Sequence, residues 1–219
     1  MMACPSCSLV QLKHTAPQEV LYSRHYWYRS GINEKIVNDL KEIAGVAMRH
    51  APKGGSILDI GANDGTLLKF ISGDYRRAGV EPADNLQDAL RENCDIVIHD
   101  FWRYHEGDAR HDVITAIGMF YDLDEPLEFV TDIRRALKPG GIFIAQLMTA
   151  NKMVEQNDLG NLCHEHLEFY TYDSLKYLFG KAGLEIYHME ENDINGGSYR
   201  IFARHLNKGS IDYPEDRID

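Results

Sequence analysis

Apolar positions along the chain follow two alternating patterns. Short apolar runs bounded by Gly, Pro or Asp are typical of buried strands, and between them apolar residues recur at helical spacing. The predicted helices cover residues 33–50, 66–71, 83–93, 125–137 and 172–182. The predicted strands cover residues 57–60, 78–80, 95–99, 111–117, 142–147, 184–189 and 198–204. Strands that alternate with helices predict an α/β fold, a doubly wound and mostly parallel sheet with helices on both faces.

Glycine pairs mark two turns in this pattern. Lys138-Pro139-Gly140-Gly141 is expected to turn the helix over 125–137 into the strand over 142–147. Gly196-Gly197, followed by alternating polar and apolar residues over 198–204, is typical of a hairpin. The last strand is therefore expected to run antiparallel to its neighbour, at the end of an otherwise parallel sheet.

The first buried strand ends in a sharp glycine turn. Asp59 comes near the end of the apolar run, and Gly61 and Gly65 follow it. Glycine tolerates positive φ and leaves room for a ligand, and the helix that begins after the turn offers unpaired N–H groups. The spacing is neither the G-x-G-x-x-G of dinucleotide enzymes nor a phosphate-binding loop, which needs Gly-Lys-Ser/Thr. A packing turn in an unrelated α/β protein is the alternative.

Two further positions belong to the same edge of the predicted sheet. Glu81 lies 20 residues after Gly61, and an acid at about this distance accepts hydrogen bonds from a ribose diol in nucleotide-binding α/β folds. Asp100 and Phe101 suit an adenine amino group and ring, or else a helix cap beside a core Phe. The turn resembles the first motif of class I S-adenosylmethionine (SAM) methyltransferases. On that resemblance the cofactor-binding residues are Asp59, Gly61, Asn63, Asp64, Gly65, Glu81, Pro82, Asp100 and Phe101.

Charge and composition narrow the class of ligand. With 34 acidic residues against 23 Lys and Arg, the net charge is -11. Nucleic-acid binding needs a basic surface, so no nucleic-acid partner is expected. No apolar run has membrane-spanning length and the N-terminus carries no signal peptide, which favours a soluble cytoplasmic protein without a membrane partner. A small or nucleotide-linked substrate is expected.

Two N-terminal features fall outside the sheet pattern. Cys4 and Cys7 form C-x2-C, half of a zinc knuckle. A structural zinc needs four ligands, and His14 can add only one, so Cys4 and Cys7 form an incomplete site and zinc is not expected in this chain. The stretch 21–31 is dense in aromatics and fits no simple period. It is expected to be a loop, either a lid over a ligand or a hydrophobic flap packed on the domain.

The segment after the strand over 142–147 carries the densest candidate chemistry. His164-Glu165-His166 lies at the edge where a parallel sheet places the substrate. Three interpretations stay open. The two imidazoles, on alternating positions of an extended segment, can share a metal; they can be hydrogen-bonded to backbone in a structural role; or one His can be a general base that Glu165 orients or tunes.

Together these motifs resemble the SAM-dependent C-methyltransferases that act on nucleotide-linked deoxy-keto sugars in antibiotic and surface-polysaccharide pathways. The matching pieces, in the expected order, are 4–12, 26–31, 59–65, 119–123, 164–166 with Tyr170, and 195–198. Members of that family have two cysteine pairs in the zinc region, a further sugar-binding domain after the core, and often a Tyr where Cys163 stands. The chain is therefore expected to be a fragment or a shortened member.

The resemblance implies a mechanism. His166 removes a proton beside a ketone, and the resulting enolate carbon takes the methyl group of SAM, which leaves S-adenosylhomocysteine. Glu165 assists His166, His164 has a positioning role, and Tyr28 donates to the enolate oxygen. Methyl transfer to oxygen or nitrogen of another small metabolite, and SAM or sugar binding without turnover, are the alternative functions.

The resemblance also implies how the chain is divided. Residues 1–15 would be the remnant of the zinc-binding region, and residues 16–50 the aromatic loop and a helix. Residues 51–207 would form the methyltransferase domain, and residues 208–219 a linker or a truncated continuation. The oligomeric state does not follow from any of these motifs.

Overall fold

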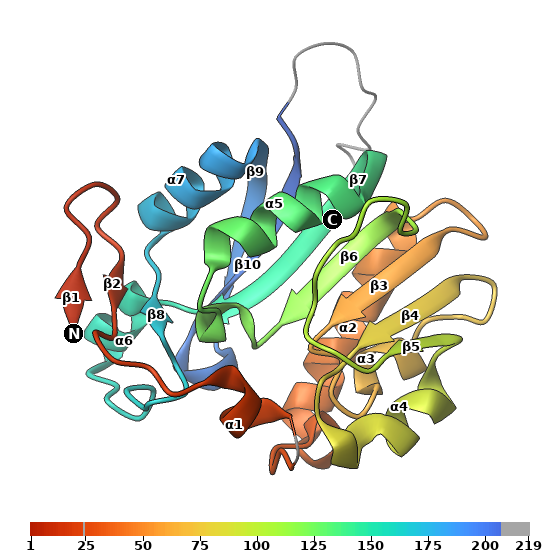
Figure 1. The fold of residues 1–219 in the computed structure, drawn as a ribbon, viewed down its shortest axis with the longest axis horizontal. Coiled ribbons are helices and arrows are strands. Elements are labelled where there is room, and N and C mark those ends of the chain that lie inside the picture. Colours follow the sequence, from red (N-terminus) through yellow and green to blue (C-terminus); the bar gives the residue numbers. More distant parts are fainter. Residues whose placement is uncertain (24, 207–219) are drawn as a thin grey trace.

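The central feature of the computed structural model is one large sheet with helices on both faces (Figure 1). The structure describes residues 1–23 and 25–206. Within this part of the chain the large sheet has seven strands in the order β5-β4-β3-β6-β7-β10-β9. In that order their bounds are Ile96–Ile98, Arg76–Val80, Ser56–Ile60, His111–Ile117, Leu137–Met148, Ser198–His205 and Leu184–Asn192.

Strand directions confirm the predicted sheet. The five strands from β5 to β7 are parallel neighbours. β10 runs antiparallel to both β7 and β9, as the Gly196-Gly197 signal predicted. Chain order reverses between β3 and β6, so the segments that follow these two strands diverge and leave a crevice at their carboxyl ends.

One face of the sheet is covered by α2 (Glu34–His50), α3 (Thr66–Lys69) and α4 (Gln87–Asn93), whose apolar residues share one core cluster. Asn33 caps the start of α2, and its side-chain oxygen accepts hydrogen bonds from the N–H groups of Lys35 and Ile36. This cap and the apolar stripe of the helix explain why the sequence pattern predicted it well.

The other face is covered by α5 (Pro126–Ala136) and α7 (Tyr172–Ala182), which lie in front of the sheet in Figure 1. Beneath them the ring of Phe179 stacks on Phe120 and on Phe143, with centroids 5.8 and 6.0 Å away. Phe120 opens the short turn η3 (Phe120–Asp122) after β6. The aromatic core therefore fixes the turn that carries Tyr121 and Asp122 to the crevice.

Three predicted boundaries were wrong. Residues 138–141 are not a separate turn, because β7 already starts at Leu137. Gly140 lies inside this strand at φ +78°, and the pairing of β7 with β6 shifts register in this region. The helix over 66–71 is the single turn α3. The helix over 83–93 divides into η2 (Asp84–Leu86) and α4.

Short elements were missed because they are too short to show a period. β1 (Met2–Ala3), β2 (Val10–Gln11) and β8 (Glu168–Phe169) form a second small sheet. α1 (Gln18–Tyr22), η1 (Ser30–Ile32), α6 (Ala150–Gln156) and η4 (Ile194–Gly196) complete the described elements. No helix in residues 1–23 and 25–206 combines the length and apolarity needed to cross a membrane. The predicted linker over 208–219 and Arg24 of the aromatic stretch lie outside the described residues.

Candidate functional site

The glycine turn after β3 has the conformation that its sequence requires. Gly61 has φ +69°, and a Cβ at this position would lie 2.9 Å from the Cγ of Met119. The N–H groups of Gly61 and Ala62 donate to the Val80 carbonyl at 2.9 and 3.0 Å, which ties the turn to the end of β4. A larger residue at Gly61 would both strain the backbone and displace Met119.

Glu81 follows β4 and is only 5% exposed. Its Oε2 accepts a hydrogen bond from the Asn63 N–H and its Oε1 accepts one from the Ala83 N–H, each at 2.9 Å. Burial raises the pKa of this carboxyl, and the two backbone hydrogen bonds oppose that rise. A carboxylate has about four acceptor positions, so two remain for hydroxyl groups of a ligand.

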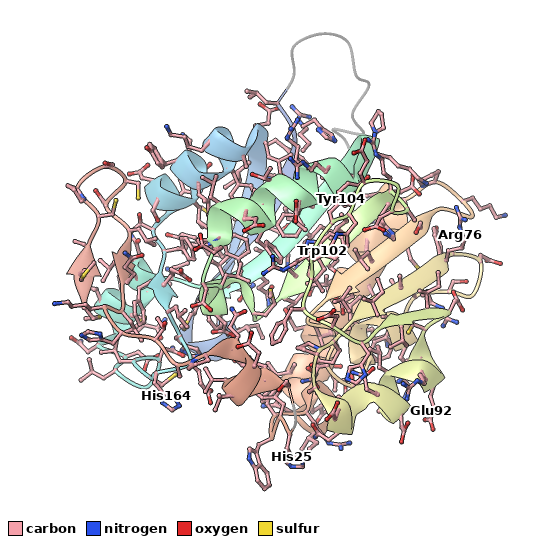
Figure 2. All side chains as sticks on the ribbon, in the orientation of Figure 1. His25, Arg76, Glu92, Trp102, Tyr104 and His164 are labelled. Atoms are coloured by element: carbon pink, nitrogen blue, oxygen red, sulfur yellow. The ribbon has the colours of Figure 1, made fainter. Side chains whose placement is uncertain are left out.

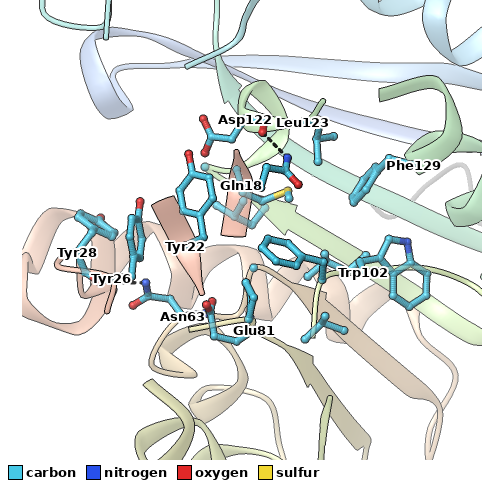
Figure 3. Close-up of a pocket in the computed structure, with 18 of the residues that line it drawn as sticks. Gln18, Tyr22, Tyr26, Tyr28, Asn63, Glu81, Trp102, Asp122, Leu123 and Phe129 are labelled. Atoms are coloured by element: carbon cyan, nitrogen blue, oxygen red, sulfur yellow. Dashed lines mark hydrogen bonds between the residues drawn. The ribbon is translucent and has the colours of Figure 1, made fainter. Parts of the chain in front are cut away.

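A cavity opens between Glu81 and the turn, called the Glu81 cavity below (Figure 3). Tyr26 and Tyr28 stand at one end of it, and Trp102 and Phe129 at the other. Of the predicted cofactor-binding residues, those that line it are Gly61, Asn63, Glu81, Pro82 and Phe101. These residues follow three different strands, β3, β4 and β5, and they line one cavity.

Four of the predicted cofactor-binding residues lie outside this cavity. Asp59 is buried in the sheet, where its Oδ1 accepts a hydrogen bond from the Thr115 hydroxyl at 2.6 Å, and burial raises its pKa to about 7. Gly65 has φ +77° and faces α4, with Asn93 Cβ 2.9 Å from where its own Cβ would be. Asp100 is exposed, and one of its oxygens accepts from the Phe101 N–H at 2.7 Å.

The fourth, Asp64, holds the aromatic loop. One of its oxygens accepts from the Gly31 N–H at 2.9 Å, and the other from the Thr66 hydroxyl at 2.6 Å. Asn63 makes a second attachment, since its amide accepts from the Ser30 N–H at 3.0 Å and donates to the Tyr28 carbonyl at 3.1 Å. The loop is therefore fastened to the glycine turn and borders the ligand space.

A second cavity, called the His166 cavity, lies on the other side of this loop. Five residues line both cavities and form a common wall: Tyr26, Tyr28, Ser30, Ile117 and Gly118. Tyr121, Glu165 and His166 line only the second cavity. The two cavities are therefore neighbours that share part of their lining.

The His166 ring is fixed in the second cavity. Its Nδ1 lies 2.9 Å from the Asn161 carbonyl oxygen, which can only accept. Nδ1 therefore carries a proton, and in the neutral ring Nε2 holds the free lone pair. Burial lowers the pKa of His166, while the Asn161 contact and Glu165 work against that shift. A neutral imidazole with a free Nε2 has the form of a general base.

The two neighbours of His166 differ. Glu165 lines the His166 cavity, and its backbone carbonyl accepts from the Tyr22 hydroxyl at 3.3 Å. His164 is exposed and lines neither cavity, and Figure 2 shows it at the edge of the molecule. The segment forms a turn instead of the extended stretch that was expected, so the two imidazoles do not face the same space.

Sequence reasoning missed a polar network at the base of the His166 cavity. Arg200 of β10 is buried and donates to Asp39 Oδ1 at 2.8 Å and to Gln146 Oε1 at 2.9 Å. Gln146 in turn donates to the other Asp39 oxygen at 2.6 Å. An Arg in the middle of the alternating last strand was the available signal, but its partners Asp39 and Gln146 are distant in sequence.

Cys4 and Cys7 lie in the turn between β1 and β2. Within residues 1–23 and 25–206 no group of three or more His, Cys, Asp or Glu side chains could hold a metal ion. The described residues therefore do not supply the four ligands of a structural zinc site.

A model of the methyltransferase domain family matches residues 28–189, well over half of the chain. The chain belongs to this methyltransferase domain family. The matched range runs from the aromatic loop through the glycine turn and His166 to β9.

The methyltransferase domain is also similar to individual proteins. It is 24% identical to the C-methyltransferase NovU of Streptomyces niveus over 212 residues, 93% of this chain and 50% of that protein. The chain thus spans about half the length of this curated relative. Its fold matches the CcbJ methyltransferase of Streptomyces caelestis with a TM-score of 0.63 at 19% identity, over 77% of this chain and 90% of that one.

A third similar structure is the Burkholderia thailandensis 1,6-didemethyltoxoflavin-N1-methyltransferase, which has S-adenosylhomocysteine bound. Its TM-score is 0.60 at 14% identity, over 78% of both chains. At such identities the likeness shows the fold alone. That fold is the class I SAM-dependent methyltransferase fold that the resemblance of the glycine turn implied.

Proposed function

We propose that this domain binds SAM in the Glu81 cavity and methylates a carbon of a ligand held in the His166 cavity. The observation that carries the proposal is that the two cavities share a wall. Glu81, an acid placed to accept ribose hydroxyls, lines the first cavity, and His166, with the form of a general base, lines the second. The similarity to a C-methyltransferase and the resemblance described above favour a nucleotide-linked keto-deoxysugar as the substrate.

The residues of the Glu81 cavity suit SAM chemically. The free acceptor positions of Glu81 would take the ribose hydroxyls, and Pro82 and Phe101 would lie beside the adenine. Gly61 lines the cavity with its backbone, which would lie beside the methionine part. When bound, SAM supplies a methyl group on a sulfonium leaving group.

In the His166 cavity, Nε2 of His166 would remove the proton from the carbon beside the ketone. The negative charge that then develops on the ketone oxygen needs a hydrogen-bond donor. Tyr28 lines this cavity, and burial and the nearness of Asp64 raise its pKa, so its hydroxyl keeps its proton and can donate. Glu165 lines the same cavity and would favour the protonated form of His166 once the proton has moved.

Two measurements test the proposal in sequence. Calorimetric titration with S-adenosylhomocysteine tests the cofactor site, and absence of binding would refute it. Incubation of the protein with a nucleotide-linked keto-deoxysugar in deuterium oxide, without SAM, tests the base. Deuterium incorporation beside the ketone supports C-methylation. Methyl transfer without such exchange would favour an oxygen or nitrogen acceptor, and binding without transfer would favour a non-catalytic role.

A further inference from the structure

Asp122, at the end of η3, is a buried acid that the proposed reaction does not use. It is 9% exposed and lines the Glu81 cavity (Figure 3). Its Oδ1 has no hydrogen-bond partner among the described residues. A buried carboxyl oxygen without a partner is costly, and its position on a cavity wall points to a partner supplied by a ligand.

The groups that face Asp122 carry no positive charge. Three of them are tyrosines, Tyr22 of α1, Tyr26 of the aromatic loop and Tyr121 of η3 itself. The other two are acids, Glu165 in the segment before β8 and Glu168 in β8. None of the described residues that line the Glu81 cavity is a Lys or an Arg. Burial and the charge of Glu165 raise the pKa of Asp122 well above its usual range, and the Tyr22 hydroxyl only partly opposes this. Without a ligand the carboxyl therefore keeps its proton to unusually high pH.

Asp122 also directly follows a residue of the His166 cavity in the chain, although it is not one of the five residues that line both cavities. The preceding residue, Tyr121, lines the His166 cavity, and its ring centroid is 4.6 Å from that of His166. Asp122 itself lines the Glu81 cavity. A methyl donor in the Glu81 cavity must point its methyl group toward the His166 cavity, so its charged sulfur would lie on the side of the Glu81 cavity that is next to the His166 cavity.

We propose that Asp122 recognises the positive charge of SAM and so distinguishes SAM from S-adenosylhomocysteine. This inference rests on the proposed function. As SAM binds, the O–H bond of the Asp122 carboxyl breaks, the proton passes to solvent, and the carboxylate faces the cation. S-adenosylhomocysteine has no sulfonium charge and binds with the carboxyl protonated. After methyl transfer the carboxylate loses its partner and takes up a proton, which favours product release.

Calorimetry of the unmodified chain tests this directly. Titrations of SAM and of S-adenosylhomocysteine at neutral pH, each in two buffers of different ionisation enthalpy, give the number of protons released. The expected result is that more protons are released with SAM than with S-adenosylhomocysteine. Equal proton release for the two ligands would overturn the proposal, and this measurement needs no variant.

The matching variant is Asp122→Asn, which keeps the shape and removes the ionisable group. It should lower SAM affinity on the order of 10- to 100-fold, as expected for loss of an interaction with a charged group. The affinity for S-adenosylhomocysteine should change by less than about twofold. The affinity of the unmodified chain for SAM should rise with pH, because less work is needed to remove the proton, and the variant should lose that part of the pH dependence.

Glu168→Gln is the matched control. Glu168 is also buried and also has an unpartnered oxygen, Oε2, but it lines neither cavity. It should leave both affinities within about twofold of the unmodified chain. An equal loss of both ligands in Asp122→Asn would mean that Asp122 contacts a part common to them, which overturns the inference but leaves the proposed function standing. If neither ligand binds the unmodified chain, the proposed function itself fails.

Discussion

The ring of His166 meets the ring of Tyr121 edge-on, with 4.6 Å between centroids and 70° between planes. The backbone joins the same two segments, since the Leu167 N–H donates to the Tyr121 carbonyl at 2.8 Å. The proposed base is therefore attached to η3, the turn that also places Asp122 on the cofactor side. A small shift of this turn would disturb both cavities at once.

Asp59 gives a prediction about stability and not about binding. Its folded-state pKa of about 7 lies above the value of about 3.9 for an unfolded chain, so the folded protein holds a proton that the unfolded chain releases between these values. On account of this group, the free energy of unfolding should fall as pH rises from about 4 to about 7 and stay level above. Asp59→Asn removes this loss and should gain stability relative to the unmodified protein over the same interval.

Denaturant unfolding of both proteins at several pH values in that interval measures the difference. The Thr115 hydroxyl can still donate to the Asn oxygen, so the variant should fold. Because Asp59 lines neither cavity, the affinity for S-adenosylhomocysteine should stay within about twofold. A large loss of affinity would place Asp59 in the binding site after all.

Glu81→Ala should weaken SAM binding by at least about tenfold, because the ribose hydroxyls lose a charged acceptor. The structure adds a second consequence. The same carboxylate accepts from the N–H groups of Asn63 and Ala83, so the variant should also lose roughly 1–3 kcal/mol of stability. Calorimetry and denaturant unfolding measure the two effects separately.

Glu92→Ala is the control for this variant, since Glu92 is an exposed acid on the nearby α4. It should change neither quantity measurably. If Glu81→Ala lost stability but kept full affinity for SAM, Glu81 would be a support of the turn and not the ribose acceptor.

The large sheet could be predicted because each of its strands has a local signal. The strand Ser56–Ile60 is buried along its whole length and is mostly apolar in sequence. The turn after it needs glycine at positive φ. α2 and α7 carry their own caps, at Asn33 and Thr171. Such features depend on nearby residues alone, so a single sequence displays them.

The site was only partly predictable because its composition depends on distant contacts. Asp64 looks like a ligand-binding acid in sequence, but the Gly31 N–H occupies one of its oxygens. Asp122 falls within the matching piece 119–123, but nothing in that piece marks it as an acid that faces a ligand, and only burial and the neighbouring Tyr22 and Glu165 reveal it. Whether an acid meets a ligand or the protein's own backbone is decided by tertiary packing, which local pattern does not contain.

Zinc gives a prediction about the N-terminal turn. Cys4 and Cys7 supply half of the usual ligand set, so this chain alone should not retain stable zinc. After washing with a chelator, the metal content of the purified protein should be well below one zinc per chain. A Cys4→Ser, Cys7→Ser double variant should give the same content. A stoichiometric amount of zinc that the double variant loses would reveal ligands from elsewhere.

The pH dependence of exchange should report the state of His166. Burial lowers its pKa below the usual value of about 6.5, so the neutral, basic form persists into mildly acidic solution. The rate of deuterium exchange beside the ketone should therefore stay level through neutral pH and fall only below the usual histidine range. A fall that begins above neutral pH would point to a different base.

His166→Ala is the decisive substitution for the mechanism. The ring lines the substrate-side cavity and is only partly buried, so its loss should cost little stability and leave SAM affinity unchanged. Exchange and methyl transfer should both fall by about two to four orders of magnitude, because the base acts before any methyl group moves. His164→Ala is the neighbouring control: its exposed ring lines neither cavity, so both rates should stay close to normal. Exchange at the normal rate in His166→Ala would assign the base elsewhere, and unfolding of that variant alone would show that the histidine is structural.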